Sequence, residues 1–532
     1  MNSHNFYTAK TALIVALGGF LMGFDASVIS GVATFVEIEF QLSKLQLGWA
    51  VASLSLAATF AMLVAGPISD KLGRKPLLKA AALCFAISAL WSAVAGSFPE
   101  LVLARMLGGF GVGTALIIAP LYIAELSPAE HRGRLVSFNQ LNIVVGISAA
   151  FFSNYLILRL GNLDAEWATQ LRLREWSWRW MLSVEMLPAV FYFLVLRLVP
   201  ESPRWLIMHG RSTSALHILR KTCGDDAAAT EIAAISENIS NTQGEAASQL
   251  PLRDLFSKPV RWVLGIGVSV AVLQQITGIN SVFFYAPMIF EQSGIGTDAA
   301  FMQAVIVGLT NLTFTIVALL LIDKIGRKPL LIAGVAGITC SMFLLAWAFH
   351  SASYSLSAEA ISDLITLSSN PALRALQDIV FDSDVTFKNA LAEAVGVDTL
   401  RQFESAFIAA AINMNPTLIL WGIIGFVASF AVSLGPVMWV LFSELFPSRL
   451  RAVAISFVGF INSGVSFLVQ LVFPWQLATL GSSATFLIYG LFALVGLIIV
   501  VRFIPETRGK SLEQIELELV PGLARAQQER SS

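Results

Sequence analysis

Twelve long apolar stretches divide the chain, and they restrict its fold more than any other feature. Each is about 20 residues long, which is the length that a helix needs to cross the roughly 30 Å hydrocarbon core of a bilayer. The stretches cover residues 11–31, 46–68, 77–96, 101–124, 137–158, 179–199, 261–290, 301–322, 329–350, 417–442, 452–475 and 483–504. Because a helix satisfies its own backbone hydrogen bonds in lipid, the pattern predicts an all-α polytopic membrane protein with twelve transmembrane helices.

The composition excludes a soluble protein. Hydrophobic residues make up 56% of the chain and charged residues only 13%, whereas soluble domains carry about 25% charged residues. A net charge of −1 without a long basic cluster gives no indication of nucleic-acid binding. No nucleophile–base pair, metal cluster or nucleotide loop stands out, so we expect neither an enzyme nor a bound cofactor or metal.

The basic residues predict the orientation. On our count about 25 of the 34 Lys and Arg residues lie in alternate loops, the 200–260 connector and the C-terminal tail. The positive-inside rule then places both termini and the connector in the cytoplasm. We therefore expect a multi-pass protein of the cell membrane, either a plasma membrane or a bacterial inner membrane.

The sequence repeats itself once. The segment Asp70-Lys-Leu-Gly-Arg-Lys-Pro-Leu-Leu recurs from Asp323 as Asp-Lys-Ile-Gly-Arg-Lys-Pro-Leu-Leu, and Glu125-Leu-Ser-Pro recurs from Glu444 as Glu-Leu-Phe-Pro. Parallel repeats of this kind form the two six-helix halves of rocking transporters. The predicted parts are an N-terminal half (1–199), a cytoplasmic helical connector (200–260), a C-terminal half (261–515) and a cytoplasmic tail (516–532).

The second half carries an insertion. Asp70 and Glu125 are 55 positions apart but Asp323 and Glu444 are 121 apart, so the second half has 66 more residues between its two motifs. The additional residues must lie at about 351–415, on the extracellular side. Ser383 and Asp384 are predicted to cap one helix that stops at Gly396, and Asp398 to cap another. The pattern suits a small helical cap without chemistry, and a lid or a partner-binding role stays open.

Several motifs together resemble the sugar porters of the major facilitator superfamily, over nearly the whole chain. The resemblance rests on Gly66-Pro-Ile-Ser-Asp-Lys-Leu-Gly-Arg-Lys, Arg105-Met-Leu-Gly-Gly-Phe-Gly-Val-Gly, Pro120-Leu-Tyr-Ile-Ala-Glu, Pro200-Glu-Ser-Pro-Arg-Trp, Gln274-Gln-Ile-Thr-Gly-Ile-Asn, Gly435-Pro-Val-Met-Trp and Pro505-Glu-Thr-Arg-Gly-Lys. It implies the major facilitator fold. The run Gly108-Gly-Phe-Gly-Val-Gly lies within a span, where small residues allow close helix packing.

The resemblance also implies a sugar site. A sugar hydroxyl both donates and accepts hydrogen bonds, and so does an amide. The positions that match the family's sugar-binding residues are Gln140, Gln274, Gln275, Asn280, Asn311, Trp439 and Asn462. Ser463 and Phe284 depart from the Trp and Tyr of many relatives, which leaves the sugar unidentified. Polar contacts between helices are the alternative role for any single amide.

The resemblance further implies proton coupling. Asp25 lies within the first span and Arg105 begins the fourth, and a lone charge in mid-bilayer costs at least about 2.5–3.5 kcal/mol. Asp25 and Arg105 match the carboxylate–arginine pair of symporting members, and Glu185 matches an acidic residue beside it. A purely structural ion pair is the alternative.

Charges at the cytoplasmic ends of the spans match the family's gates. They are Asp70, Arg74, Glu125, Arg132, Glu201, Asp323, Arg327, Glu444, Arg451 and Glu506. Generic solvated loop charges are the alternative.

The sequence therefore predicts a proton-coupled symporter that imports a monosaccharide or related polyol by alternating access, acting as a monomer. A proton-independent sugar facilitator is the nearest alternative. A sensor without transport is a further one, although sensors of this fold tend to carry a long cytoplasmic tail.

Overall fold

A computed structural model describes residues 3–128, 132–246, 255–257, 260–446, 450–510 and 514–515. The predicted 516–532 tail lies outside these residues. The chain forms two compact units. The first comprises residues 1–27, 53–150 and 179–254, and the second comprises residues 28–52, 151–178 and 255–532. The second unit thus includes two short segments from the N-terminal part of the sequence.

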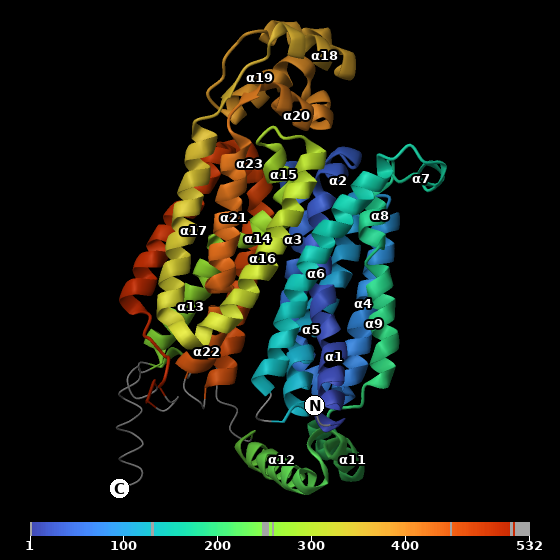
Figure 1. Ribbon diagram of the computed structural model, residues 1–532, viewed down its shortest axis with the longest axis vertical. Coiled ribbons are helices and arrows are strands. Elements are labelled where there is room, and N and C mark those ends of the chain that lie inside the picture. The colour runs from blue at the N-terminus through green and yellow to red at the C-terminus, as the bar shows by residue number, and fades with distance from the viewer. Residues whose placement is uncertain are drawn as a thin grey trace. The chain divides into compact units, whose positions relative to one another are not determined.

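Helices account for nearly all regular structure in the described residues (Figure 1). Up to the connector they are α1 (Ser3–Val28), η1 (Ile29–Gly31), α2 (Ala33–Glu39), α3 (Lys44–Leu72), α4 (Arg74–Val94), α5 (Phe98–Leu126), α6 (Arg132–Gly161), α7 (Glu166–Gln170), α8 (Ser177–Ser183), α9 (Met186–Val195) and η2 (Leu196–Leu198). The connector forms α10 (Pro203–Met208), α11 (Ser212–Cys223) and α12 (Asp225–Ala246).

The C-terminal part continues in the same manner. Its elements are α13 (Arg261–Ile276), α14 (Ile279–Phe284), α15 (Ala286–Glu291), α16 (Thr297–Ile325), α17 (Arg327–His350), β1 (Ser353–Tyr354), α18 (Ala358–Ser368), η4 (Pro371–Leu376), α19 (Asp384–Val395), α20 (Val397–Ala411), β2 (Ile412–Asn413), α21 (Pro416–Val432), α22 (Leu434–Leu445) and α23 (Arg451–Phe503).

The last helix explains how the described residues provide twelve spans. Eleven helical stretches are long and apolar enough to cross a membrane. One of them, α23, has 53 residues, and at 1.5 Å per residue it would be about 80 Å long, more than twice the thickness of the hydrocarbon core. Gly481 interrupts α23 with φ 83° and ψ 167°, so α23 makes two passes. The predicted all-α fold with twelve transmembrane helices is confirmed.

The glycine run in α5 packs closely against α3. A Cβ atom at Gly109 would overlap the carbonyl oxygen of Leu54, and one at Gly113 would overlap that of Ala58. These positions accept no side chain because backbone atoms, which cannot rotate away, occupy the space. The run therefore brings two helix backbones together, as the sequence predicted.

The insertion at 351–415 is a small helical domain with its own core. α18, α19 and α20 gather at the end of the second unit beyond α17 and α21 (Figure 1). Buried apolar side chains from all three helices form one cluster, and the rings of Tyr354 and Phe387 stack with their centroids 5.4 Å apart. At its base β1 pairs antiparallel with β2, with Ser353 opposite Asn413. The insertion is therefore helical and packs around its own apolar cluster.

One predicted boundary in the insertion is confirmed and one is wrong. Ser383 caps α19 by accepting a hydrogen bond from the Val385 N–H, and α19 ends before Gly396, whose φ of 86° stops the helix. Asp398 does not cap α20. Gly396 holds the N-cap position and Asp398 lies in the first turn, where its carboxylate pairs with Arg401.

Candidate functional site

Asp25 and Arg105 form a buried ion pair in the first unit. The two side chains are 0% and 2% exposed. The guanidinium nitrogen Nη1 of Arg105 pairs with Asp25 Oδ1, and Nη2 donates to the Asp25 backbone oxygen at 3.0 Å. A Cβ atom at Gly108 would overlap Asp25 Oδ2, so this glycine makes room for the carboxylate beside α5. The pair that the sequence predicted is thus formed in the interior of the unit.

Glu185 belongs to the same polar group. It is 2% exposed and lies at the break between α8 and α9, close enough to Asp25 and Arg105 to interact with both charges. Asp25 Oδ2, Arg105 Nε and Glu185 Oε1 have no hydrogen-bond partner within the described residues. Since buried polar atoms are rarely left unpaired without a functional reason, the group resembles a site where charge changes during function.

Four of the predicted amides meet in the second unit. Gln275 Nε2 donates to Gln274 Oε1 at 3.1 Å and to Asn462 Oδ1 at 3.2 Å. Asn462 Nδ2 donates to Gln274 Oε1 at 2.9 Å, and Asn280 Nδ2 donates to Gln275 Oε1 at 2.8 Å. This amide cluster connects α13, α14 and α23, and it presents both donors and acceptors.

A sharp turn between α13 and α14 positions the cluster. Gly278 has φ 86°, and a Cβ atom there would lie 2.6 Å from the Tyr489 ring. Only glycine fits both the left-handed backbone and the contact. The turn allows Asn280 to reach back to Gln275, which explains why a glycine stands between the amides of this motif.

Sequence reasoning missed two polar neighbours of the cluster. Asn280 also donates to Ser466 Oγ at 2.7 Å, and Gln470 Nε2 donates to the same hydroxyl at 2.8 Å. Asn462, Ser466 and Gln470 follow one another at intervals of four residues, so they share one face of α23. That polar stripe in an apolar span was the signal that could have identified them.

The remaining predicted binding residues lie apart from the cluster's hydrogen bonds. Asn311 is 5% exposed on α16, and Trp439 on α22 is 42% exposed, with its ring edge-on to Phe442. Gln140 lies on α6 in the first unit and is half-buried.

The predicted gate charges of the first unit form one network. Arg74 Nη2 pairs with Glu125 at 2.9 Å and Nη1 pairs with Asp70 at 3.0 Å. Glu201 accepts hydrogen bonds from the N–H groups of Arg74 and Lys75 at 3.0 and 3.2 Å, so it caps α4 from a distant part of the sequence. The side chain of Arg132 lies outside the described residues.

The second unit repeats this network. Arg327 Nη2 pairs with Glu444 at 2.9 Å. Glu506 accepts hydrogen bonds from the N–H groups of Arg327 and Lys328 at 3.2 and 3.1 Å and thereby caps α17. Arg451 Nε donates to the Phe446 carbonyl at 3.2 Å. The side chain of Asp323 lies outside the described residues.

At the end of the second unit that carries the insertion, segments from the two sequence halves pack tightly. A Cβ atom at Gly48 of α3 would overlap the Leu471 carbonyl oxygen of α23, and the rings of Trp49 and Phe467 meet edge to face at 5.4 Å. The Asn162 side chain also donates to Asp298 at 3.2 Å. These contacts close this end of the unit.

Comparisons with known proteins agree with this geometry. A family model described as Sugar (and other) transporter matches residues 11–365 and 403–519. An arabinose-proton symporter from Bacillus subtilis (strain 168) is 34% identical, covering 94% of this chain and 92% of its own. A protein from Arabidopsis thaliana described as probable polyol transporter 4 is 34% identical, covering 98% of this chain and 86% of its own. A structure of the xylose transporter XylE from E. coli, described as a partially occluded inward open conformation, has a TM-score of 0.72 at 31% identity and covers 95% of this chain and 99% of its own.

Proposed function

Because this chain belongs to the sugar transporter family of the major facilitator superfamily, we propose that it is a proton-coupled symporter that imports a monosaccharide or related polyol by alternating access. The observation that supports this proposal most is the buried Asp25–Arg105 pair with its unpartnered atoms. Two relatives that span nearly the whole chain are described as a proton symporter and a probable polyol transporter. The protein acts as a monomer in the cell membrane, with both termini in the cytoplasm.

The amide cluster is the proposed sugar site. Gln274, Gln275, Asn280 and Asn462 hold one another in place, so their free donor and acceptor positions are oriented before a sugar arrives. Preorganised groups lose little entropy when they bind a ligand. Asn311 and Trp439 of the same unit complete the proposed site, and Gln140 of the first unit stays a predicted sugar-binding residue. The exposed Trp439 ring would cover the apolar face of a sugar ring.

The Asp25–Arg105 pair is the proposed proton site. Protonation of Asp25 removes the charge that holds Arg105, and a buried arginine without its partner is costly. The loaded protein therefore favours a different arrangement of helices. Loss of the proton to the cytoplasm restores the pair. Glu185 is near enough to take part in this exchange of charge.

The paired networks around Arg74 and Arg327 are the proposed cytoplasmic gates. Each ties three helix ends of one unit together through an arginine and two glutamates. The end of the second unit that carries the insertion is then the extracellular end. The contacts of Gly48 and Trp49 there correspond to a state that is closed towards the outside.

Transport assays test the function directly. Purified protein in liposomes should take up one or more members of a panel of radiolabelled hexoses, pentoses and polyols, and an inward proton gradient should accelerate that uptake. Uptake that ignores the gradient would identify a facilitator instead. Absence of uptake for every compound on the panel would contradict the proposed substrate class.

Gln275→Leu should weaken sugar binding by about tenfold. The change removes the hub of the amide cluster, and a lost hydrogen bond of about 1 kcal/mol is joined by the cost of buried neighbours left without a partner. The half-saturation constant for uptake measures the effect. Asn142→Leu is the matched control, because the Asn142 amide donates within its own helix to Phe138. An unchanged constant in Gln275→Leu would exclude this cluster from the site.

A further inference from the structure

The insertion is firmly attached to the second half of the sequence. Its two ends are joined by β1 and β2, and Asp384 Oδ2 accepts hydrogen bonds from the Ser482 N–H at 2.9 Å and the Ser482 hydroxyl at 3.0 Å. Ser482 follows the Gly481 bend between the last two spans. Because Asp384 is itself buried, the attachment is a packed contact, and the insertion should move together with α23.

A partly buried ion network connects the insertion to the outer end of α3. Glu404 of α20 pairs with Lys388 of α19 at 2.8 Å and with Lys44 of α3 at 3.6 Å. Lys44 also pairs with Glu37 of α2 at 2.6 Å. Gln292, directly after α15, donates to Glu404 and accepts a hydrogen bond from Lys388. Lys44 and Glu404 belong to different halves of the sequence, although both pack in the second unit.

The charge of Glu404 persists over the pH range in which a proton gradient operates. Burial by itself would raise the pKa of Glu404, but Lys388 and Lys44 outweigh that effect and hold the pKa well below its usual value. A carboxylate whose pKa is lowered on folding contributes stability that is lost only as the pH falls towards the lowered pKa. A fall in the external pH within the range of a physiological proton gradient therefore leaves the Lys44–Glu404 pair ionised.

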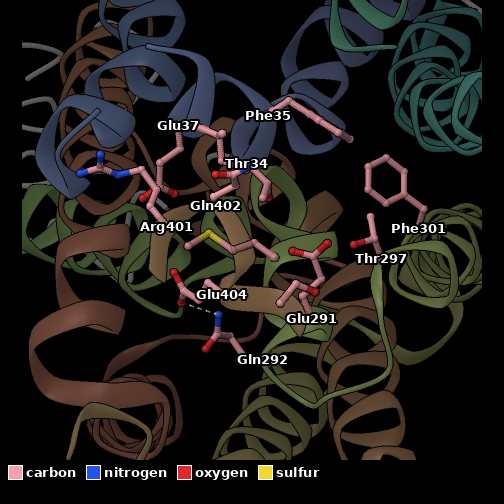
Figure 2. A pocket seen from close by; sticks show the side chains of 13 residues that line it. Thr34, Phe35, Glu37, Glu291, Gln292, Thr297, Phe301, Arg401, Gln402 and Glu404 are labelled. Carbon is pink, nitrogen blue, oxygen red and sulfur yellow. Dashed lines mark hydrogen bonds between the residues drawn. The ribbon is translucent and has the colours of Figure 1, made fainter. Parts of the chain in front are cut away.

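A cavity of about 140 Å³ lies beside this network. Figure 2 shows Glu37, Glu291 and Glu404 around it, with Thr34 and Phe35 from one side and Thr297 and Phe301 from another. Its lining comes from α2, α15, α16 and α20. α20 therefore closes over a space at the outer end of the unit, next to the helices that a substrate from outside must pass.

Part of the network lies outside the region that the family model matches. The family model leaves residues 366–402 unmatched, and this range includes Lys388 and all of α19. Glu404 lies just beyond the gap. Lys388, which pairs with Glu404, thus lies outside the matched region, whereas Glu404 lies within it.

We propose that the insertion is an extracellular latch, in which the Lys44–Glu404 ion pair holds α20 against α3 and must break each time the outer cavity opens. In the proposed cycle the insertion moves with the second half, and Lys44, which packs in the second unit in this state, moves with the rest of its helix α3 when the outer end opens. The latch biases the protein towards the state that is closed outside, and it adds to the barrier for sugar entry. The proposal depends on the alternating-access cycle, but it can be tested without measuring transport.

Thiol labelling from outside measures opening of the cavity. Ser405 lines the cavity, so Ser405→Cys is a reporter in a background where Cys84, Cys223 and Cys340 are replaced by Ser. A membrane-impermeant maleimide is applied to liposomes that contain the full chain. Lys44→Gln should be labelled about three- to tenfold faster than the parent, which corresponds to about 0.7–1.4 kcal/mol.

Two further variants separate the latch from general loosening. Lys44→Arg keeps the charge and should keep the parent rate. Asp398→Asn is the matched control, because it removes an ion pair that joins Asp398 and Arg401 within α20 alone. Glu404→Gln should accelerate labelling like Lys44→Gln, which covers the case that Lys44→Gln does not fold. Parent rates in both Lys44→Gln and Glu404→Gln, or equal acceleration in Asp398→Asn, would overturn the proposal.

Discussion

Asp25→Asn should abolish proton-driven accumulation of sugar while exchange of sugar across the membrane continues. A proton that crosses a potential of 100 mV contributes about 2.3 kcal/mol, which supports a roughly 40-fold concentration ratio. An asparagine has the size of the aspartate but carries no charge to gain or lose, so the ratio in the variant should fall to about one. Asn can still accept a hydrogen bond from Arg105, which favours folding of the variant.

The measurement is the steady-state ratio of inner to outer sugar in liposomes with an inward proton gradient, together with counterflow of labelled sugar without a gradient. Asp225→Asn is a suitable control because Asp225 is a surface carboxylate paired with Arg220 in the connector. Accumulation that persists in Asp25→Asn would make the buried pair structural. Loss of counterflow as well would point to a folding defect, which gel filtration in detergent would reveal.

Gly48→Val should reduce uptake by about 100-fold or more. The Cβ atom would overlap the backbone oxygen of Leu471, and a backbone atom cannot move aside as a side-chain end can. A hundredfold loss corresponds to about 2.8 kcal/mol, within the usual cost of overpacking. The clash exists only where α3 meets α23, so the variant should fold but fail to close its outer end.

Tryptophan fluorescence and external thiol labelling at Ser405→Cys would report that failure. The labelling rate should rise in Gly48→Val, because the cavity stays open. Gly265→Val is the matched control, since nothing lies within 4 Å of a Cβ atom at Gly265. Normal uptake by Gly48→Val would show that the α3–α23 contact is not part of the transport cycle.

The sequence was sufficient for the fold because hydrophobic length alone determines how many helices cross a membrane. The twelve predicted stretches reappear as helices, and Gly481 separates the last two although the helical hydrogen bonding runs on around it. Local rules also succeeded where a short polar side chain meets a helix start, as Ser383 does. They failed at Asp398, since a glycine one position before the helix already provides the N-cap backbone.

The sequence could propose candidate sites as sets of residues but not the contacts that join those residues into networks. Motifs predicted a gate role for Glu201 and Glu506, and the structure shows that both cap helices more than 100 residues away, a contact that no spacing rule contains. The pair of Lys44 and Glu404 was missed for a related reason. In the sequence Lys44 stands just before a predicted span and Glu404 in an insertion, so both look like solvated charges until the fold brings them together.

The short β1–β2 ladder at the base of the insertion has an evolutionary and practical consequence. Opposed residues in an antiparallel pair lie about 5 Å apart, so the chain leaves the bundle at Ser353 and returns at Asn413 through almost the same point. A module with adjacent ends can be gained or lost in one genetic event without moving the flanking spans. It can equally be exchanged for a tight turn, or for a tag that antibodies recognise, and the shortened protein would still have its membrane core intact.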